Sequence, residues 1–419
     1  MLPLLFVIFA VLGAPLFAVI AAAALNGFHS GDMELSIVAL EINRLVDTPV
    51  LISIPLFTFA GYMLGETDAP NRMVRMTRAV LGWMPGGLAV VTLIVCAMFT
   101  AFTGASGVTI IALGSLLYPA LKTDGYPERF SLGLITTSGS LGILFLPAIP
   151  LILYGVIAET SIDKLFAAGM LPGILMLVLL SVYSLFRSRM AKIPLQEFRW
   201  KELGAAAWNS KWDLPLPFIV IGGIYSGIFA ISEAAAVTAF YVLFIAMVIT
   251  REIKPRNLPG VMRRSMTLVG GILIILAVSM ASTNYLIDQQ IPSKLFAFVK
   301  AHIDSKYSFL VILNIFLLIL GCILDIFSAI VLVIPLILPI AKSYGIDPVH
   351  LGIIFLANMQ IGYCTPPIGM NLFISSYRFK KPIVTIYRST LPFLVILLGV
   401  VLIITYWTDL SLFLAQYFD

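Results

Sequence analysis

Charged residues are scarce in this sequence. Only 11% of its 419 residues are Asp, Glu, Lys or Arg, whereas 60% are apolar. An ordinary soluble domain has about 25% charged and about 45–50% apolar residues. So few charges cannot cover the surface of a soluble globule, and the apolar content excludes a disordered chain. Because a membrane-spanning helix uses ~20 apolar residues, we predict an all-α polytopic membrane protein with no room for a sizeable soluble domain.

Cysteine and histidine are also sparse, and their spacing suits no metal centre, redox pair or catalytic set. The six residues are Cys96, Cys322, Cys364, His29, His302 and His350. The sequence has no phosphate-binding loop, zinc-protease motif or Ser-His-Asp order in a workable context. We therefore expect neither a membrane enzyme nor a bound cofactor.

The basic residues indicate how the chain is oriented. The net charge is +5, and 18 of the 26 Lys and Arg residues lie in four short segments, 72–78, 187–211, 251–264 and 378–388. Lys and Arg concentrate in the cytoplasmic loops of membrane proteins, so we predict that all four segments face the cytoplasm. They lack the regular interleaving of aromatic residues that a single-strand nucleic-acid groove needs, so we expect no nucleic-acid partner.

The spans between these segments can be counted. Residues 1–25 are apolar and lack the basic start that a signal peptide needs. We expect a retained first span there, an acidic outer loop at 32–47 and a second span over 48–66. Two further spans, over 214–230 and 233–250, join the second and third basic segments.

Four other apolar runs are interrupted. Runs 86–121 and 307–341 break at 104–107 and 321–325, while runs 131–158 and 351–377 break at 147–150 and 365–367. Unpaired backbone cannot face lipid, so such breaks survive only against protein or a water-filled cavity. We interpret the first pair as re-entrant helical hairpins and the second pair as broken transmembrane helices. Full crossings would satisfy the charge pattern equally well.

The two interrupted regions also resemble each other. Eleven positions match or are conservatively replaced at an offset of 219–221 residues, among them Pro119 with Pro339 and Pro147 with Pro367. Under the predicted topology the copies enter from opposite faces, which makes them an inverted repeat. We assign the repeats to 1–190 and 231–419, joined by a cytoplasmic basic loop and linking helix at 191–230. Secondary transporters place their binding site where such discontinuous helices meet.

Polar residues occupy the first break. Thr103, Ser106 and Thr109 offer hydroxyls to a cation or a substrate oxygen, and Gly104 and Gly107 permit a tight tip. Small-residue packing between membrane helices is the competing interpretation.

Two acidic residues stand out. Asp325 lies in the break of 307–341, and a carboxylate at membrane depth is by default a functional candidate. Its alternative role is to cap the second arm of its hairpin. Glu233 lies in a turn between two spans, where an N-cap role together with Ser232 competes with an accessory site role.

The segment 365–371, with the sequence TPPIGMN, is the sharpest local signal. Its prolines remove backbone donors and free upstream carbonyls, and Asn371 adds both a donor and an acceptor. Its counterpart in the first half keeps Pro147 but lacks the polar groups. Asn358 lies on the approach to the break, where hydrogen bonding between helices is an equally good explanation.

Five segments, taken in order, resemble the large membrane subunit of the tripartite ATP-independent periplasmic (TRAP) transporters. They are 54–61, 102–107, 149–155, 222–235 and 365–371. The resemblance covers essentially the whole chain. It implies an elevator-type, ion-transporter-superfamily-like fold and sodium-driven import of an organic anion, such as a C4-dicarboxylate or sialic acid. It also implies a bacterial inner membrane, a soluble periplasmic binding protein and a separate small four-helix membrane subunit.

The resemblance also implies which residues form the site. The implied substrate contacts are Ser106, Gly107, Thr109, Pro147, Asn358, Gly369 and Asn371. The implied sodium ligands are Thr103, Gly104, Ser106, Asp325, Thr365 and Pro366, with Glu233 as an accessory residue. The residues before Glu233, Ala-Ile-Ser, depart from the Thr-Pro-Thr usual in the family.

Two alternatives to a transporter stay open. An anion channel needs a continuous polar lining or a ring of carbonyls, whereas the polar residues here cluster at two breaks. An intramembrane enzyme lacks a catalytic set.

Overall fold

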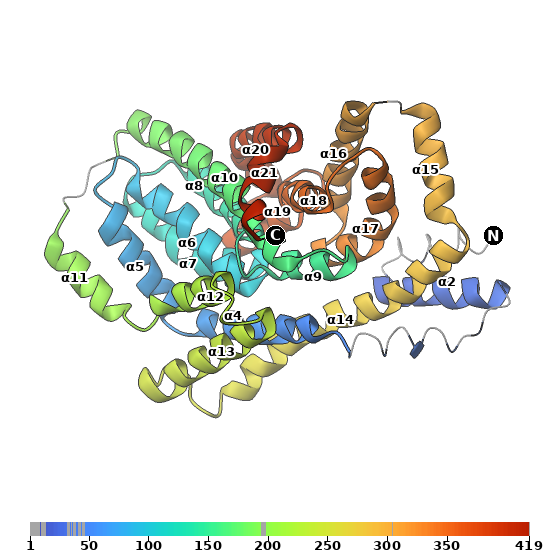
Figure 1. Ribbon diagram of the computed structural model, residues 1–419. Coiled ribbons are helices and arrows are strands. Elements are labelled where there is room, and N and C mark those ends of the chain that lie inside the picture. Colours follow the sequence, from blue (N-terminus) through green and yellow to red (C-terminus); the bar gives the residue numbers. More distant parts are fainter. Residues whose placement is uncertain are drawn as a thin grey trace.

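A computed structural model of the chain describes residues 9, 14–31, 34, 36, 39–40, 43, 47–193, 198–303 and 305–418 (Figure 1). These residues form helices and no strand. Seven helices are long and apolar enough to cross a membrane, or up to eight spans if the bent pair Glu128–Leu144 and Ile149–Ile157 counts as one. The predicted all-α polytopic class is confirmed. Most of residues 1–13 and of the predicted outer loop at 32–47 lie outside the described residues.

The elements fall into two halves and a connection. The first half contains α2 (Leu16–Ser30), η1 (Pro49–Ile52), α4 (Ser53–Glu66), α5 (Ala69–Leu81), α6 (Gly87–Thr103), α7 (Ser106–Thr123), α8 (Glu128–Ser138), η2 (Leu141–Leu144), α9 (Ile149–Ile157) and α10 (Ile162–Met190). The connection contains α11 (Trp200–Asn209) and α12 (Pro215–Tyr225). The second half contains α13 (Ile231–Phe244), η3 (Ile245–Ile249), α14 (Leu258–Asp288), α15 (Ile291–His302), α16 (Lys306–Ile323), α17 (Ile326–Ser343), α18 (Pro348–Gly362), α19 (Met370–Phe379), α20 (Ile383–Tyr406), α21 (Thr408–Ala415) and η4 (Gln416–Phe418).

All four predicted interruptions are present. The run 86–121 is α6 and α7, and the run 307–341 is α16 and α17, each pair separated by two residues. In the broken helices the gaps are wider than predicted, at 139–148 and 363–369, with only the short turn η2 inside the first. Pro150 does not belong to the break, because it lies in the first turn of α9. Proline is tolerated there, since backbone N–H groups in the first turn make no hydrogen bond within the helix.

The predicted full span at 214–230 is wrong in length. Its helix, α12, has 11 residues, whereas a full crossing needs ~20.

Among the described residues two X-Pro peptide bonds are cis, Leu146-Pro147 and Pro366-Pro367, and they occupy matched positions of the sequence repeat. The inverted relation of the two halves stays a prediction.

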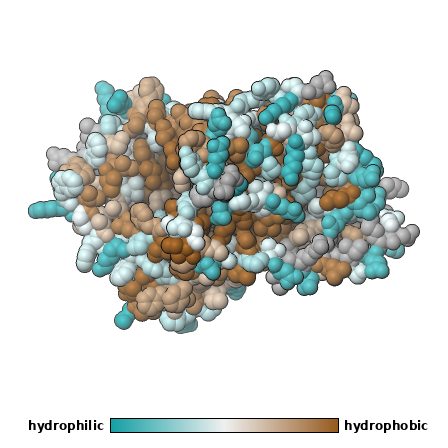
Figure 2. Space-filling view, viewed as in Figure 1, coloured by the Kyte–Doolittle hydropathy of each residue, from teal (hydrophilic) through white to brown (hydrophobic). Residues whose placement is uncertain are grey.

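The helices pack in two groups. In the lower part of Figure 1, α4 packs against α13 and α14, and α2 packs along α14. In the other group the second arm of each hairpin packs against the broken helix of the other half, α7 on α19 and α17 on α9. Hydrophobic side chains reach the surface over α12 and α13 (Figure 2), where Phe218 is 75% and Phe240 is 69% exposed. Such exposed aromatic residues suit a lipid-facing surface.

Ion pairs connect the four basic segments. Arg72 of α5 pairs with Asp213, two residues after the second segment, at 2.5 Å and with Glu252, which lies inside the third segment. Further pairs join Arg78 to Asp124 at 3.3 Å and Lys381 to Glu128 at 2.5 Å. Asp124 follows α7 and Glu128 begins α8, at the two ends of one short connection, so the first and fourth segments meet there. This proximity supports the prediction that all four segments share one membrane face.

Replacing Arg72 with glutamine should destabilise the protein. Burial by itself lowers the pKa of Arg72, but the hydrogen bonds to its two carboxylates raise that pKa above the ordinary value, so the side chain stays charged. Its partners Asp213 and Glu252 have side chains only 10% and 23% exposed. Unpairing them should cost about 3 kcal/mol of unfolding free energy, measured as a fall in Tm in detergent. The exposed pair of Arg264 and Glu66 provides the control, since R264Q should cost under about 1 kcal/mol. Equal losses in the two variants would contradict this role.

Candidate functional site

The first hairpin turns at Gly104. Its φ of 65° lies in the left-handed region that favours glycine, and the next residue, Ala105, is extended. Space is also limited there, because a Cβ on Gly104 would lie 2.6 Å from Ile149 at the start of α9. The tip of the first hairpin is therefore held against the first broken helix.

Ser106 joins this tip to the second broken helix. Its Oγ donates to Oδ1 of Asn371 at 2.8 Å, and both side chains are buried. The amide of Asn371 donates onward to the carbonyl oxygen of Thr136 at 3.4 Å. The Thr136 hydroxyl in turn donates to Ser375 at 2.8 Å. A continuous polar network thus runs from the tip through α19 to α8.

The remaining predicted residues of the first tip have different surroundings. Thr109 shares a 2.7 Å hydrogen bond with Thr100 inside its own hairpin. Gly107 is half-buried, and a Cβ there would lie 2.6 Å from Ile374 of α19. The Thr103 hydroxyl is fully buried and has no hydrogen-bond partner among the described residues. Because this hydroxyl lies beside the Gly104 turn of the hairpin tip, it is positioned to act as a cation ligand.

Asp325 forms the tip of the second hairpin. Its carboxylate accepts hydrogen bonds from the backbone N–H groups of Phe327 and Ser328, both at 3.0 Å, and from the Ser328 hydroxyl. The capping role is therefore confirmed. Asp325 is half-buried and lies in the break between α16 and α17, where the sequence places it. Capping consumes mainly Oδ1, so the carboxylate retains acceptor capacity for a cation.

The second tip also contacts the second broken helix. The hydroxyl of Tyr363 accepts a hydrogen bond from the N–H of Ile326 at 2.7 Å, and Cys322 donates to the carbonyl oxygen of Thr365 at 3.2 Å. The Thr365 hydroxyl itself donates to Ile361 at 3.0 Å. Residues 363–371 thus touch the tips of both hairpins.

Gly369 and Pro366 complete this break. Gly369 is buried, and a Cβ there would lie 2.7 Å from the carbonyl oxygens of Thr365 and Tyr363. Pro366 is exposed. In the other broken helix Pro147 is buried. The two broken helices meet where Ser140 donates to the carbonyl oxygen of Gln360 at 3.2 Å.

Helix N-termini converge on this region. α7 begins at Ser106, α9 beside Gly104 and α19 at Met370, and none of the three has a side-chain cap. The first turn of a helix carries unpaired N–H groups and the positive end of the helix dipole. Such an arrangement can bind an anion without a basic side chain.

Two predicted site residues are not part of this cluster. The Asn358 amide donates a hydrogen bond to Asn314 of α16 at 2.6 Å. The Asn314 amide in turn donates to the Thr405 hydroxyl of α20 at 3.1 Å. Asn358 therefore belongs to a separate buried polar group. Glu233 is exposed, and its carboxylate accepts the N–H of Ala230 at 2.9 Å. This is the capping alternative, although the N-cap position is occupied by Ala230, not Ser232.

Supporting residues that sequence reasoning missed include Thr100, Ser328 and Tyr363. Ser328 was detectable, because it follows Asp325 by three residues, the spacing of an N-terminal cap. Thr100 lies one helical turn before the tip. No local pattern distinguishes Tyr363, because its partner Ile326 is 37 residues away.

The overall fold matches that of a solved membrane transporter. The chain aligns with the YdaH transporter of Alcanivorax borkumensis with a TM-score of 0.66, 14% identity, and coverage of 97% of this chain and 98% of that one. At this identity the similarity shows that the two chains share a fold.

The sequence identifies the family. Residues 3–410 match the family described as the tripartite ATP-independent periplasmic transporter, DctM component. The chain is 36% identical over 380 residues to the C4-dicarboxylate TRAP transporter large permease protein DctM of Pseudomonas aeruginosa, covering 90% of this chain and 89% of that protein. The chain therefore belongs to the large permease subunits of the TRAP transporters.

Other relatives have different substrate names. The isethionate TRAP transporter permease protein DctMQ of Oleidesulfovibrio alaskensis is 33% identical, with 98% of this chain but only 65% of that longer protein covered. The ectoine/5-hydroxyectoine TRAP transporter large permease protein UehC of Ruegeria pomeroyi is 31% identical, with 97% and 96% covered.

Proposed function

We propose that the chain carries a small carboxylate or sulfonate across the bacterial inner membrane, driven by sodium ions. The observation that carries this proposal is the meeting of both hairpin tips with residues 363–371, through Ser106 and Asn371 on one side and Ile326 and Tyr363 on the other. Bringing polar helix breaks from both halves together is the arrangement of a secondary transporter site.

An anionic substrate suits the electrostatics of this region. The uncapped N-termini of α7, α9 and α19 supply donors and positive dipole ends. No arginine occurs between Arg264 and Arg378, so helix dipoles and bound sodium provide the attraction. The relatives named for C4-dicarboxylate and isethionate, both anions, support this class. The ectoine relative makes a zwitterion the second candidate.

Sodium would bind at the tips. Thr103 supplies an unpartnered buried hydroxyl, and the C-terminal turn of α6 around Gly104 supplies carbonyl oxygens. Asp325 supplies the negative charge at the other tip. Hydroxyl, carbonyl and carboxylate oxygens are the ligands that hard cations prefer.

Import would proceed by an elevator movement of the hairpins and broken helices against α4, α13 and α14. These groups meet at Gly61 of α4, where a Cβ would lie 2.5 Å from the carbonyl oxygen of Phe102. Close backbone contact through a small residue permits tight packing between membrane helices. A separate small membrane subunit and a periplasmic binding protein would complete the transporter. The DctMQ relative, of which this chain covers 65%, supports a further subunit in the assembly.

The test uses the purified chain and the complete transporter. Sodium chloride should raise the Tm of the chain relative to equimolar potassium chloride, because an ion that binds only the folded state stabilises it. In proteoliposomes containing all subunits, a sodium gradient should raise uptake of labelled succinate, isethionate or ectoine at least about tenfold. Uptake independent of the gradient would overturn the coupling, and unitary currents in a planar bilayer would favour a channel.

A further inference from the structure

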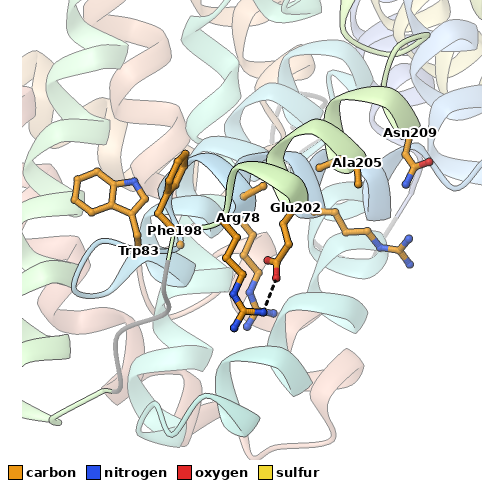
Figure 3. A pocket seen from close by; sticks show the side chains of 11 residues that line it. Arg78, Trp83, Phe198, Glu202, Ala205 and Asn209 are labelled. Atoms are coloured by element: carbon orange, nitrogen blue, oxygen red, sulfur yellow. Dashed lines mark hydrogen bonds and ion pairs between the residues drawn. The ribbon is translucent and has the colours of Figure 1, made fainter.

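A cavity of about 290 Å³ lies between α5 and α11, and its lining contains no residue of either hairpin tip (Figure 3). The side chains that give it its chemistry are Arg75, Arg78, Trp83, Phe198, Arg199 and Glu202. We call it the α5–α11 pocket. Its volume is close to the lower end of the ~300–1,000 Å³ typical of small-molecule sites, so it suits a headgroup-sized ligand.

The charge of the pocket selects an anion. The lining contains three arginines and a single carboxylate, that of Glu202. The Arg199–Glu202 pair is long, at 3.4 Å, with both side chains more than 60% exposed. Arg78 has a structural pair in Asp124 at 3.3 Å. Arg75 is exposed on the same helix. Guanidinium groups bind phosphate oxygens in bidentate fashion, so a phosphate ester is the ligand that fits.

Exposed tryptophans near the pocket favour a lipid headgroup as the source of the phosphate. Four of the five tryptophans of the chain lie in α11 or within three residues of the end of α5 or α11, namely Trp83, Trp200, Trp208 and Trp212. Trp83 is 50%, Trp200 77% and Trp208 70% exposed. Tryptophan concentrates at membrane–water interfaces, at the depth of the lipid headgroups. A basic pocket among such tryptophans would lie level with the lipid phosphates.

The segment that follows α11 is bonded to Arg72 of α5. Ser210, directly after α11, donates to the carbonyl oxygen of Arg72 at 3.3 Å, and Arg72 pairs with Asp213. A ligand in the pocket would therefore bridge two helices that are already positioned beside each other.

We propose that the α5–α11 pocket binds the headgroup phosphate of an anionic phospholipid, such as phosphatidylglycerol, and so anchors α5 and α11 at the membrane interface. Basic pockets on the cytoplasmic side of membrane proteins recognise such headgroups. Arg75 and Arg199 provide the attraction, and Glu202 opposes it.

Native mass spectrometry of the full chain in detergent, titrated with dioleoyl phosphatidylglycerol, tests this proposal. The double variant R75Q/R199Q should bind the lipid roughly tenfold more weakly than the wild type, since each arginine near the surface contributes to anionic-lipid affinity. E202Q should bind it about threefold more tightly, because it removes the opposing charge. The matched control is R256Q/R263Q, which removes two exposed arginines outside the pocket and should bind as the wild type does.

Several outcomes would overturn the proposal. One is equal loss in the two double variants, which would mean attraction by overall charge. Another is unchanged binding in R75Q/R199Q or weaker binding in E202Q. Dioleoyl phosphatidylcholine binding as tightly as the anionic lipid would refute headgroup recognition, and competition by excess inorganic phosphate at matched ionic strength would make the ligand a soluble phosphate. Gel filtration of each variant checks that it folds, and none of these substitutions touches the hairpin tips.

Discussion

Replacing Asp325 with asparagine is expected to lower sodium-driven uptake roughly a hundredfold while leaving the start of α17 intact. Asparagine caps a helix about as well as aspartate does, so its Oδ1 can still accept the N–H groups of Phe327 and Ser328. Only the negative charge is lost. A hydrogen bond or ligand contact made by a charged group is worth up to about 3 kcal/mol, or about a hundredfold.

This substitution separates the two roles of Asp325. D325A removes the cap as well as the charge, so it should lose uptake and also destabilise the hairpin. The matched control is Asp347, which caps α18 by accepting the N–H groups of Val349 at 2.7 Å and His350 at 3.3 Å. D347N should transport normally. Normal uptake by D325N together with a defect in D325A would reduce Asp325 to a helix cap.

The sodium-dependent rise in Tm gives a second readout. We expect D325N to lose most of the stabilisation that sodium chloride confers on the wild type over potassium chloride. A merely structural role would lower Tm equally in both salts. This measurement needs neither the substrate nor the partner subunits.

The second large effect concerns Ser106 and Asn371, which are joined at 2.8 Å across 265 residues of sequence. S106A leaves the Asn371 oxygen buried without this donor, and N371A leaves the Ser106 hydroxyl without its acceptor. An unsatisfied buried polar group costs about 1–3 kcal/mol. Uptake should therefore fall between roughly fivefold and a hundredfold in each variant, measured as initial rates in proteoliposomes.

A double-mutant cycle shows whether the two residues act together. The variant S106A/N371A should be no worse than the poorer single variant, because the second substitution removes a partner already lost. The matched control is S279A in α14, which removes a buried hydroxyl with no partner among the described residues. Fully additive losses would contradict coupling through the contact, and wild-type uptake in both single variants would remove these residues from the site.

The sequence by itself determined the class of the protein and the places where its helices break. Both signals are local. Apolar content fixes the preference for lipid, and glycine, proline and capping residues decide where a helix can continue, which is why the breaks around Gly104, Asp325 and Pro367 were predictable. The charge pattern likewise anticipated a shared basic face, since Arg72 meets carboxylates in or beside two other basic segments.

Only the tertiary structure decided which of the polar residues meet. Asn358 and Asn371 are similar by sequence, yet one pairs with Asn314 and the other with Ser106. The lengths of the breaks also depended on packing, since α18 ends at Gly362 where its backbone lies against Gly321 of α16. The physical reason is that contacts across hundreds of residues follow from how helices pack, whereas sequence patterns report only on a few neighbouring turns.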